Sequence, residues 1–84
     1  MIFGFQIKAG RGIVKMSQLE LSERSGISVP SIQKIEADEE KAKKANQETI
    51  RKLKVALEGA GVRFIRAKEE NGNGAGVALQ LEKK

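Results

Sequence analysis

One short stretch of the chain carries side chains that could act on another molecule. From Ser28 onward, helical spacing places Ile32 and Ile35 on one side of a helix. The opposite side carries Pro30, Gln33, Lys34 and Ala37. An amide that both donates and accepts hydrogen bonds stands there beside an ammonium group. The chemistry available on this face is therefore hydrogen bonding and charge, which suits recognition rather than bond breaking.

The residue types that most catalytic and metal sites depend on are missing. The chain has no cysteine and no histidine, which excludes disulfides, thiolate nucleophiles, Cys/His zinc sites and histidine general bases. No pair of carboxylates stands in a recognisable catalytic setting. We therefore predict that the protein is not an enzyme and that it holds no metal and no cofactor.

Length and charge limit the other functions. The 84 residues suffice for one domain with a small core, without a separate ligand-sensing domain. Sixteen Lys and Arg against 11 Asp and Glu give a net charge of +5, which favours a polyanionic partner. Nucleic acid fits, an acidic membrane surface would fit as well, and such an excess is also common without functional meaning. The apolar start, residues 1–5, is too short for a signal peptide or a membrane span, so we expect a cytoplasmic protein.

The recognition face needs two short helices to position it, and residues 17–36 predict them. Ser17 and Glu20 form a capping-box pattern, in which the serine hydroxyl and the glutamate each bind a backbone N–H, so a helix should start near Gln18. Gly26 should end it by adopting a left-handed conformation. Ser28 offers the next N-cap, with a proline in the first turn that follows. The second helix should cover residues 29–37.

This segment resembles the helix-turn-helix of the lambda-repressor/Cro-like family, also called the XRE family. The matching residues are Gln18, Leu21, Ser22, Ser25, Gly26, Ile27, Ile32, Ile35 and Glu36. Leu19 departs from the pattern because the family usually has a polar residue there, and Ser22 stands where alanine is preferred. An exposed Leu19 would suggest an additional packing contact.

The resemblance implies that the second helix, 29–37, enters the major groove of double-stranded DNA. Side chains that would face base edges are Val29, Pro30, Gln33 and Lys34. Residues that would contact phosphates are Gln18, Ser28, Ser31, Lys41 and Lys44. On composition alone, the lysines would be an ordinary solvated surface.

The resemblance also implies a partly buried ion pair between Arg11 and Glu36. Arg11 falls on the mostly apolar stripe of a helix predicted over residues 6–14. The alternative is that Arg11 lies along the surface with only its aliphatic stem packed.

The remaining chain predicts a last helix over residues 47–60, capped by Asn46, and then a change to strand periodicity. Alternation over 62–67 and 77–82 predicts a hairpin around a glycine-rich loop, residues 69–76. Residues 37–46 should carry the end of the recognition helix and a charged connection. The predicted core contains Ile7, Val14, Met16, Leu21, Ile27, Ile32, Ile35, Ile50, Leu53 and Leu57.

The fold class is therefore mainly α, a four-helix lambda-repressor-like DNA-binding domain with a C-terminal β-hairpin. We divide the chain into a helix-turn-helix domain, 1–61, and a hairpin, 62–84. Because an isolated hairpin is marginal in water, it must lean on the helices or pair with another sheet, and we favour a homodimer formed through the hairpins or the helix before them.

These expectations lead to a sequence-specific transcriptional regulator, in its simplest form a repressor that acts as a homodimer. One alternative is an antitoxin-type autorepressor, which controls its own promoter. Another is a protein-interaction adaptor that uses the same helices to bind a protein partner. Salt-dependent binding to a palindromic duplex would favour the regulator over the adaptor.

Overall fold

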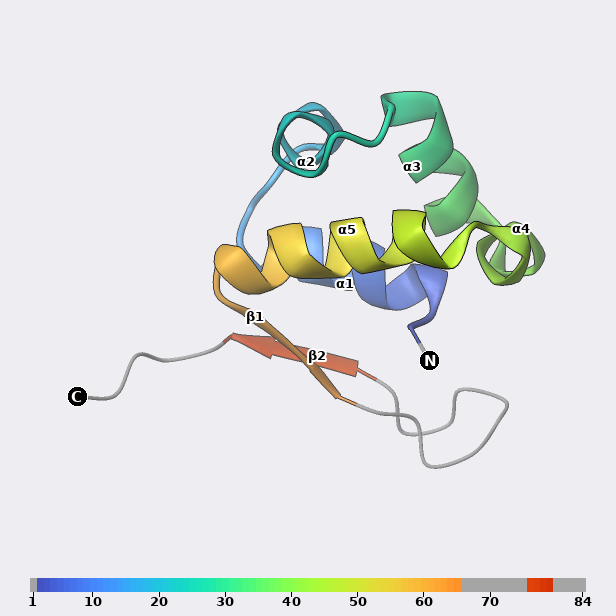
Figure 1. Ribbon diagram of the computed structural model, residues 1–84. Helices are drawn as coiled ribbons and strands as arrows, with labels where there is room; N and C mark the ends of the chain where they lie inside the picture. The colour runs from blue at the N-terminus through green and yellow to red at the C-terminus, as the bar shows by residue number, and fades with distance from the viewer. Residues whose placement is uncertain (1, 66–75, 80–84) are drawn as a thin grey trace.

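The computed structural model describes residues 2–65 and 76–79, where five helices precede a two-stranded sheet (Figure 1). The helices are α1 (Gly4–Ile13), α2 (Gln18–Ser25), α3 (Val29–Ala37), α4 (Glu39–Lys44) and α5 (Gln47–Gly59). The strands are β1 (Val62–Ile65) and β2 (Gly76–Leu79). The mainly helical class with a hairpin is confirmed. The predicted glycine-rich loop, apart from Gly76, and the predicted strand residues 66–67 and 80–82 lie outside the described residues.

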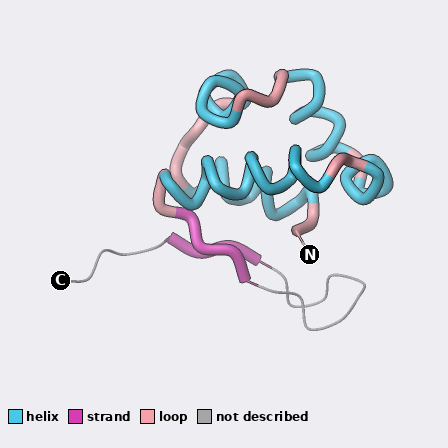
Figure 2. The backbone as a smooth tube through the Cα atoms, in the orientation of Figure 1, coloured by secondary structure: helices cyan, strands magenta, loops and turns pink. Residues whose placement is uncertain are grey.

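The helix-turn-helix begins and ends where local chemistry predicts. The Ser17 hydroxyl accepts the Glu20 N–H at 3.0 Å. The Glu20 carboxylate does not close the predicted box but accepts a hydrogen bond from Arg24, one turn later, at 3.2 Å. Gly26 ends α2 with φ of 79°, and the Ser28 side chain caps α3. Figure 2 shows the connection between these helices as a short loop.

The segment predicted as a connection contains a helix of its own, α4, so residues 2–65 form five helices in place of the expected four. Asp38 caps it by accepting the Glu40 N–H at 2.9 Å. Acidic residues occupy the first turn and lysines the last, which complements the helix dipole. Ala42 is the only buried residue of α4. The segment therefore lacks the apolar stripe from which an amphipathic helix is predicted.

The N-terminus of α1 is held by side chains from two places. The Glu39 carboxylate of α4 accepts the N–H groups of Gly4 and Phe5 at 2.9 and 2.8 Å. The Gln6 side chain accepts the Phe3 N–H at 2.8 Å. These acceptors satisfy donors that a helix start leaves unpaired, and α1 accordingly begins at Gly4, two residues before the predicted start.

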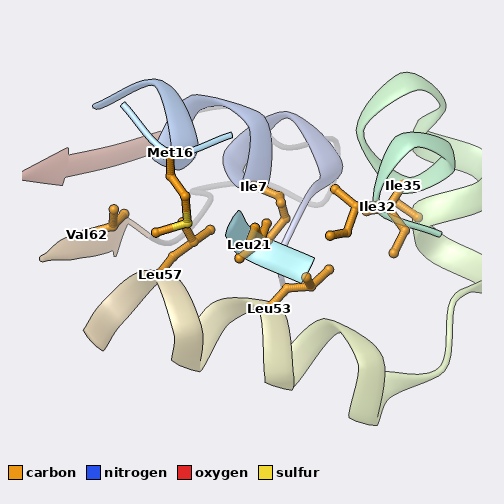
Figure 3. Close-up of a cluster of buried hydrophobic side chains, with 9 residues drawn as sticks. Ile7, Met16, Leu21, Ile32, Ile35, Leu53, Leu57 and Val62 are labelled. Carbon is orange, nitrogen blue, oxygen red and sulfur yellow. The ribbon is translucent and has the colours of Figure 1, made fainter. Parts of the chain in front are cut away.

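One core unites the helices and the first strand. Its side chains converge between α1 and α5 in Figure 3, and they come from every helix and from β1. The buried members are Ile7, Met16, Leu21, Ile32, Ile35, Ala42, Leu53, Leu57 and Val62. Val14, Ile27 and Ile50, predicted as core, are partly buried against it. Ala42 and Val62 were not in the predicted set.

The hairpin is antiparallel and pairs Val62 with Leu79 and Phe64 with Val77. Directly paired residues share a face of the sheet. On the face of Val62, this side chain belongs to the core, and Phe64 and Val77 pack against it. The strands contact α1 and α5. The Gln6 amide donates to the carbonyl oxygens of Ile65 and Gly76 at 3.0 and 2.9 Å. The hairpin therefore leans on the chain's own helices, which is one of the two supports expected for it, and pairing with a second copy stays a prediction.

No helix in the described part of the chain has the length and apolar character needed to cross a membrane.

Candidate nucleic-acid interface

The predicted recognition face of α3 is open to solvent. Pro30, Gln33 and Lys34 are exposed, and Val29 is half-buried. On the opposite side, Ile32 and Ile35 are 0 and 4% exposed. The core thus fixes the rotation of α3 about its axis, and the amide and ammonium groups face outward together.

The start of α3 is organised by two serines. The Ser28 hydroxyl accepts the Ser31 N–H at 3.4 Å. The same hydroxyl donates to the Ser31 hydroxyl at 3.0 Å. Ser28 is exposed and Ser31 half-buried, so both hydroxyls lie at the accessible end of the helix.

The end of α3 is fixed by the charged pair expected from the resemblance. Arg11 Nε and Nη2 donate to the two carboxylate oxygens of Glu36 at 2.7 and 2.8 Å, and Arg11 Nη1 donates to the Met16 carbonyl at 2.9 Å. The Arg11 and Glu36 side chains are 16 and 4% exposed. The hydrogen bond with Glu36 raises the pKa of Arg11, although burial acts in the opposite direction.

Gln18 belongs to this same cluster. Its Nε2 donates to Glu36 Oε1 at 3.1 Å, and its side chain is half-buried. One amide hydrogen is therefore committed inside the protein, which connects the start of α2 to the end of α3. The sequence pattern predicted an outward role for Gln18, without this internal contact.

A hollow of about 350 Å³ brings several predicted phosphate contacts together. Its lining comes from α3, α4 and the start of α5 and consists of Ser31, Lys34, Ile35, Lys41, Lys44, Ala45, Asn46 and Thr49. Val29, Pro30, Gln33, Ser28 and Gln18 do not line it. Asn46 was predicted only as a helix cap, and Thr49 was not singled out. Two polar residues one turn apart at the start of a predicted helix lie on the same face of it, and this spacing could have pointed to them.

This hollow is electropositive. Lys34, Lys41 and Lys44 line it, and within 2–65 and 76–79 none of them has an acidic group within 4.0 Å. Cations without acidic partners raise the local positive potential and attract anions. The chain thus places a hydrogen-bonding helix face next to a concave basic surface.

A protein-family model described as helix-turn-helix matches residues 7–58, a span that begins within α1 and ends within the last turn of α5. The span includes the recognition face, the charged pair and the basic hollow. No curated protein matches the chain.

Proposed function

The chain belongs to the XRE-type helix-turn-helix family of DNA-binding regulators, and from that premise we propose that it is a sequence-specific transcriptional repressor that inserts α3 into the major groove. A single observation carries the proposal: α3 presents Pro30, Gln33 and Lys34 to solvent while Ile32 and Ile35 anchor it from behind. An α-helix fits the major groove, where each base pair has a distinct pattern of donors and acceptors. The protein would act in the cytoplasm, without catalysis.

The two surfaces have different tasks. Gln33 suits a bidentate contact with adenine, Lys34 suits guanine or a phosphate, and Val29 or Pro30 suits a thymine methyl group. Lys41 and Lys44 would contact the phosphate backbone together with Ser31, since the lysines line one hollow. Phosphate contacts fix orientation and supply affinity, and base contacts supply the specificity. Ser28 and Gln18 complete the backbone contacts at the groove edge.

We propose that the active form is a homodimer built through the hairpin. β1 and β2 pair with each other, which leaves the outer side of each strand as an edge within the described residues. Exposed edges are templates for further strand pairing. Ile65 and Leu79 are 37 and 53% exposed on these strands. Two copies would present their recognition helices to half-sites about one DNA turn apart, roughly 34 Å.

Selection of binding sites from random duplexes, followed by fluorescence anisotropy over a range of salt concentrations, tests the DNA-binding proposal. We expect an inverted-repeat site and affinity that falls steeply with salt. Gln33→Ala should cost about 1–3 kcal/mol and relax preference at one base position, whereas Lys44→Ala should reduce the salt slope by about 1 on every sequence. Lys52→Ala is the control, because Lys52 is exposed on α5 and does not line the basic hollow. Absence of salt-dependent duplex binding would refute the proposal.

Sedimentation equilibrium tests the dimer. Ile65→Lys should shift the protein toward monomer, because a charge on an edge strand opposes strand pairing. Leu19→Lys removes an exposed apolar residue from α2 and should leave the assembly unchanged. A wild-type monomer at concentrations that saturate the duplex would contradict the dimer while leaving the DNA-binding proposal intact.

An adaptor function is the second candidate, and Leu19 favours it. This side chain is 61% exposed and stands where the family usually has a polar residue. Capture of a protein partner that Leu19→Lys abolishes, together with no duplex binding, would support the adaptor. Binding of both a duplex and a protein would instead support an antitoxin-type autorepressor.

A further inference from the structure

A second hollow, of about 300 Å³, is lined by the N-terminal segment, α4 and the start of α5. Figure 1 shows where these three segments lie in the domain. Its apolar lining consists of Ile2, Phe3, Ala42, Ala45 and Ile50. None of the predicted DNA contacts lines it. Ligand pockets in proteins begin at about this size and are mostly apolar, with a few polar groups that fix orientation.

The rim of this apolar hollow is basic. Lys43 of α4 and Arg51 and Lys54 of α5 contribute to the lining. Each has an acidic neighbour on its own helix: Lys43 with Glu40 at 3.9 Å, Arg51 with Glu48, and Lys54 with Glu58 at 3.7 Å. The two lysine pairs are exposed and long, and pairs of this kind are weak, so both lysines can turn toward an anion in the hollow. Arg51 is held by two hydrogen bonds to Glu48.

One acidic residue, Glu39, also lines the apolar hollow. Both of its oxygens accept backbone N–H groups at the start of α1. These hydrogen bonds hold the carboxylate at the start of α1, and within the described residues no cation of the rim lies within 4.0 Å of it. The three cations outnumber this one negative charge. An apolar floor with three cations at its mouth matches a molecule that has a short apolar body and one anionic end.

The helix α4 lines the apolar hollow and also carries two lysines proposed to contact DNA. Ala42 and Lys43 line the apolar hollow, whereas Lys41 and Lys44 of the same helix line the basic hollow, and Ala45 belongs to both. The six-residue helix is thus a shared wall. A molecule bound in the apolar hollow would contact α4, whose backbone also carries the two lysines of the basic hollow.

We propose that the apolar hollow is an effector site that binds a small amphipathic anion, a free molecule with a short apolar chain and a carboxylate or similar group, and that its occupancy changes the phosphate contacts made from α4. Binding of the anion does not depend on the proposed function, whereas its effect on DNA contacts rests on that function. This site would place sensing inside the DNA-binding domain itself.

Titration of the full chain with octanoate, followed by ¹H–¹³C methyl NMR, tests the site. We expect saturable shifts confined to the methyl groups of the lining residues Ile2, Ala42, Ala45 and Ile50. Affinity should rise from butanoate through hexanoate to octanoate, by up to about fifteenfold for each added pair of methylenes. Octanol, which has the same chain without the charge, should bind at least several-fold more weakly.

Charge variants separate the site from general attraction to a basic protein. The double variant Lys43→Gln/Lys54→Gln should weaken octanoate at least threefold and fold normally, since both side chains are exposed. Lys52→Gln removes an exposed cation of α5 that lies outside the lining, and it should leave the affinity for octanoate unchanged. Scattered shifts, equal binding of octanol, or equal weakening by Lys52→Gln would each overturn the site.

The regulatory half has its own measurement. Saturating octanoate should change the dissociation constant of the selected duplex at least threefold, and the duplex should change the affinity for octanoate by the same factor, because coupling between two sites is reciprocal. Octanoate binding without that change would overturn the regulation and leave the site. Failure of the protein to bind any duplex would refute the proposed function while the octanoate titration still decides the site.

Discussion

Replacing Arg11 with methionine should be far more damaging than replacing a surface arginine. The Glu36 carboxylate is 4% exposed and accepts two hydrogen bonds from Arg11, at 2.7 and 2.8 Å, and one from Gln18, at 3.1 Å. Without Arg11 it keeps only the amide contact. The substitution therefore leaves a buried charge without its counter-charge.

The magnitude follows from burial. Removing one partner of a buried ion pair costs about 3–5 kcal/mol. Arg11 retains 16% exposure and Gln18 stays in place, so we expect the lower end, about 3 kcal/mol. A domain of this length has about 4–13 kcal/mol of total stability, and the melting temperature should fall by roughly 12–24 °C. The remaining stability should still permit folding at low temperature.

Urea unfolding followed by circular dichroism measures this loss in a double-mutant cycle. The variants are Arg11→Met, Glu36→Leu and the double substitution, with Arg24→Met as the control. Arg24 pairs with Glu20 across α2 with both side chains more than 40% exposed, so its loss should cost less than about 1 kcal/mol. The double variant should be more stable than the sum of the single losses predicts. Additive losses, or an Arg11→Met cost no greater than that of Arg24→Met, would refute the buried-pair reasoning.

Three further predictions concern positions outside the recognition face. Gln6→Leu should lower the free energy of unfolding by about 2–4 kcal/mol, because it leaves backbone groups at the start of α1 and in the hairpin without partners. Urea unfolding, with hydrogen exchange of the strand amides, measures this loss. A loss below about 1 kcal/mol would mean that water replaces the amide. Gly4→Ala should destabilise the domain by about 1–3 kcal/mol, since the added Cβ would overlap the backbone of α3. Gly12→Ala, whose Cβ would meet no other atom, should stabilise it by about 0.5–1 kcal/mol. Equal effects of the two variants in thermal melts would contradict this packing. The pKa of Glu48 should lie below its usual range because of its hydrogen bond to Arg51. Its small contribution to stability is therefore present above the ordinary pKa of a glutamate and is lost as the pH falls through the lowered pKa. In Arg51→Gln, a ¹³C-detected titration should show the pKa of Glu48 returning toward the usual range, and no return would assign the shift to another cause.

The helix-turn-helix could be predicted from sequence because its boundaries depend on neighbouring residues. Ser17, Gly26 and Ser28 act within a few positions of their own place in the chain, through hydrogen bonds or through φ. The inward isoleucines of α3 follow from helical period alone. Such local rules need no knowledge of the tertiary structure.

The features that sequence reasoning missed depend on partners far along the chain. Gln6 is a polar residue with 0% exposure, and its hydrogen-bonded carbonyls lie 59 and 70 residues away. Glu39 caps a helix that begins 35 residues earlier. A buried polar side chain is stable only when its partners are in place, and no periodicity reveals them. The contacts of the hairpin with α1 and α5 likewise join residues far apart in the chain.

The helix α4, which the sequence analysis did not predict, explains how this small domain can hold in place the lysines proposed to contact phosphates. Ordering a free lysine side chain at an interface costs about 0.5–1.5 kcal/mol, and a loop would add the cost of ordering its backbone. In α4, Asp38 and Glu39 fix one end by hydrogen bonds to backbone N–H groups, and Ala42 fixes the middle in the core. The backbone under Lys41 and Lys44 is therefore ordered before any duplex arrives. Because Glu39 ties that backbone to α1, Glu39→Ala should weaken duplex binding even though its carboxylate is an anion whose removal ought, by charge alone, to strengthen it.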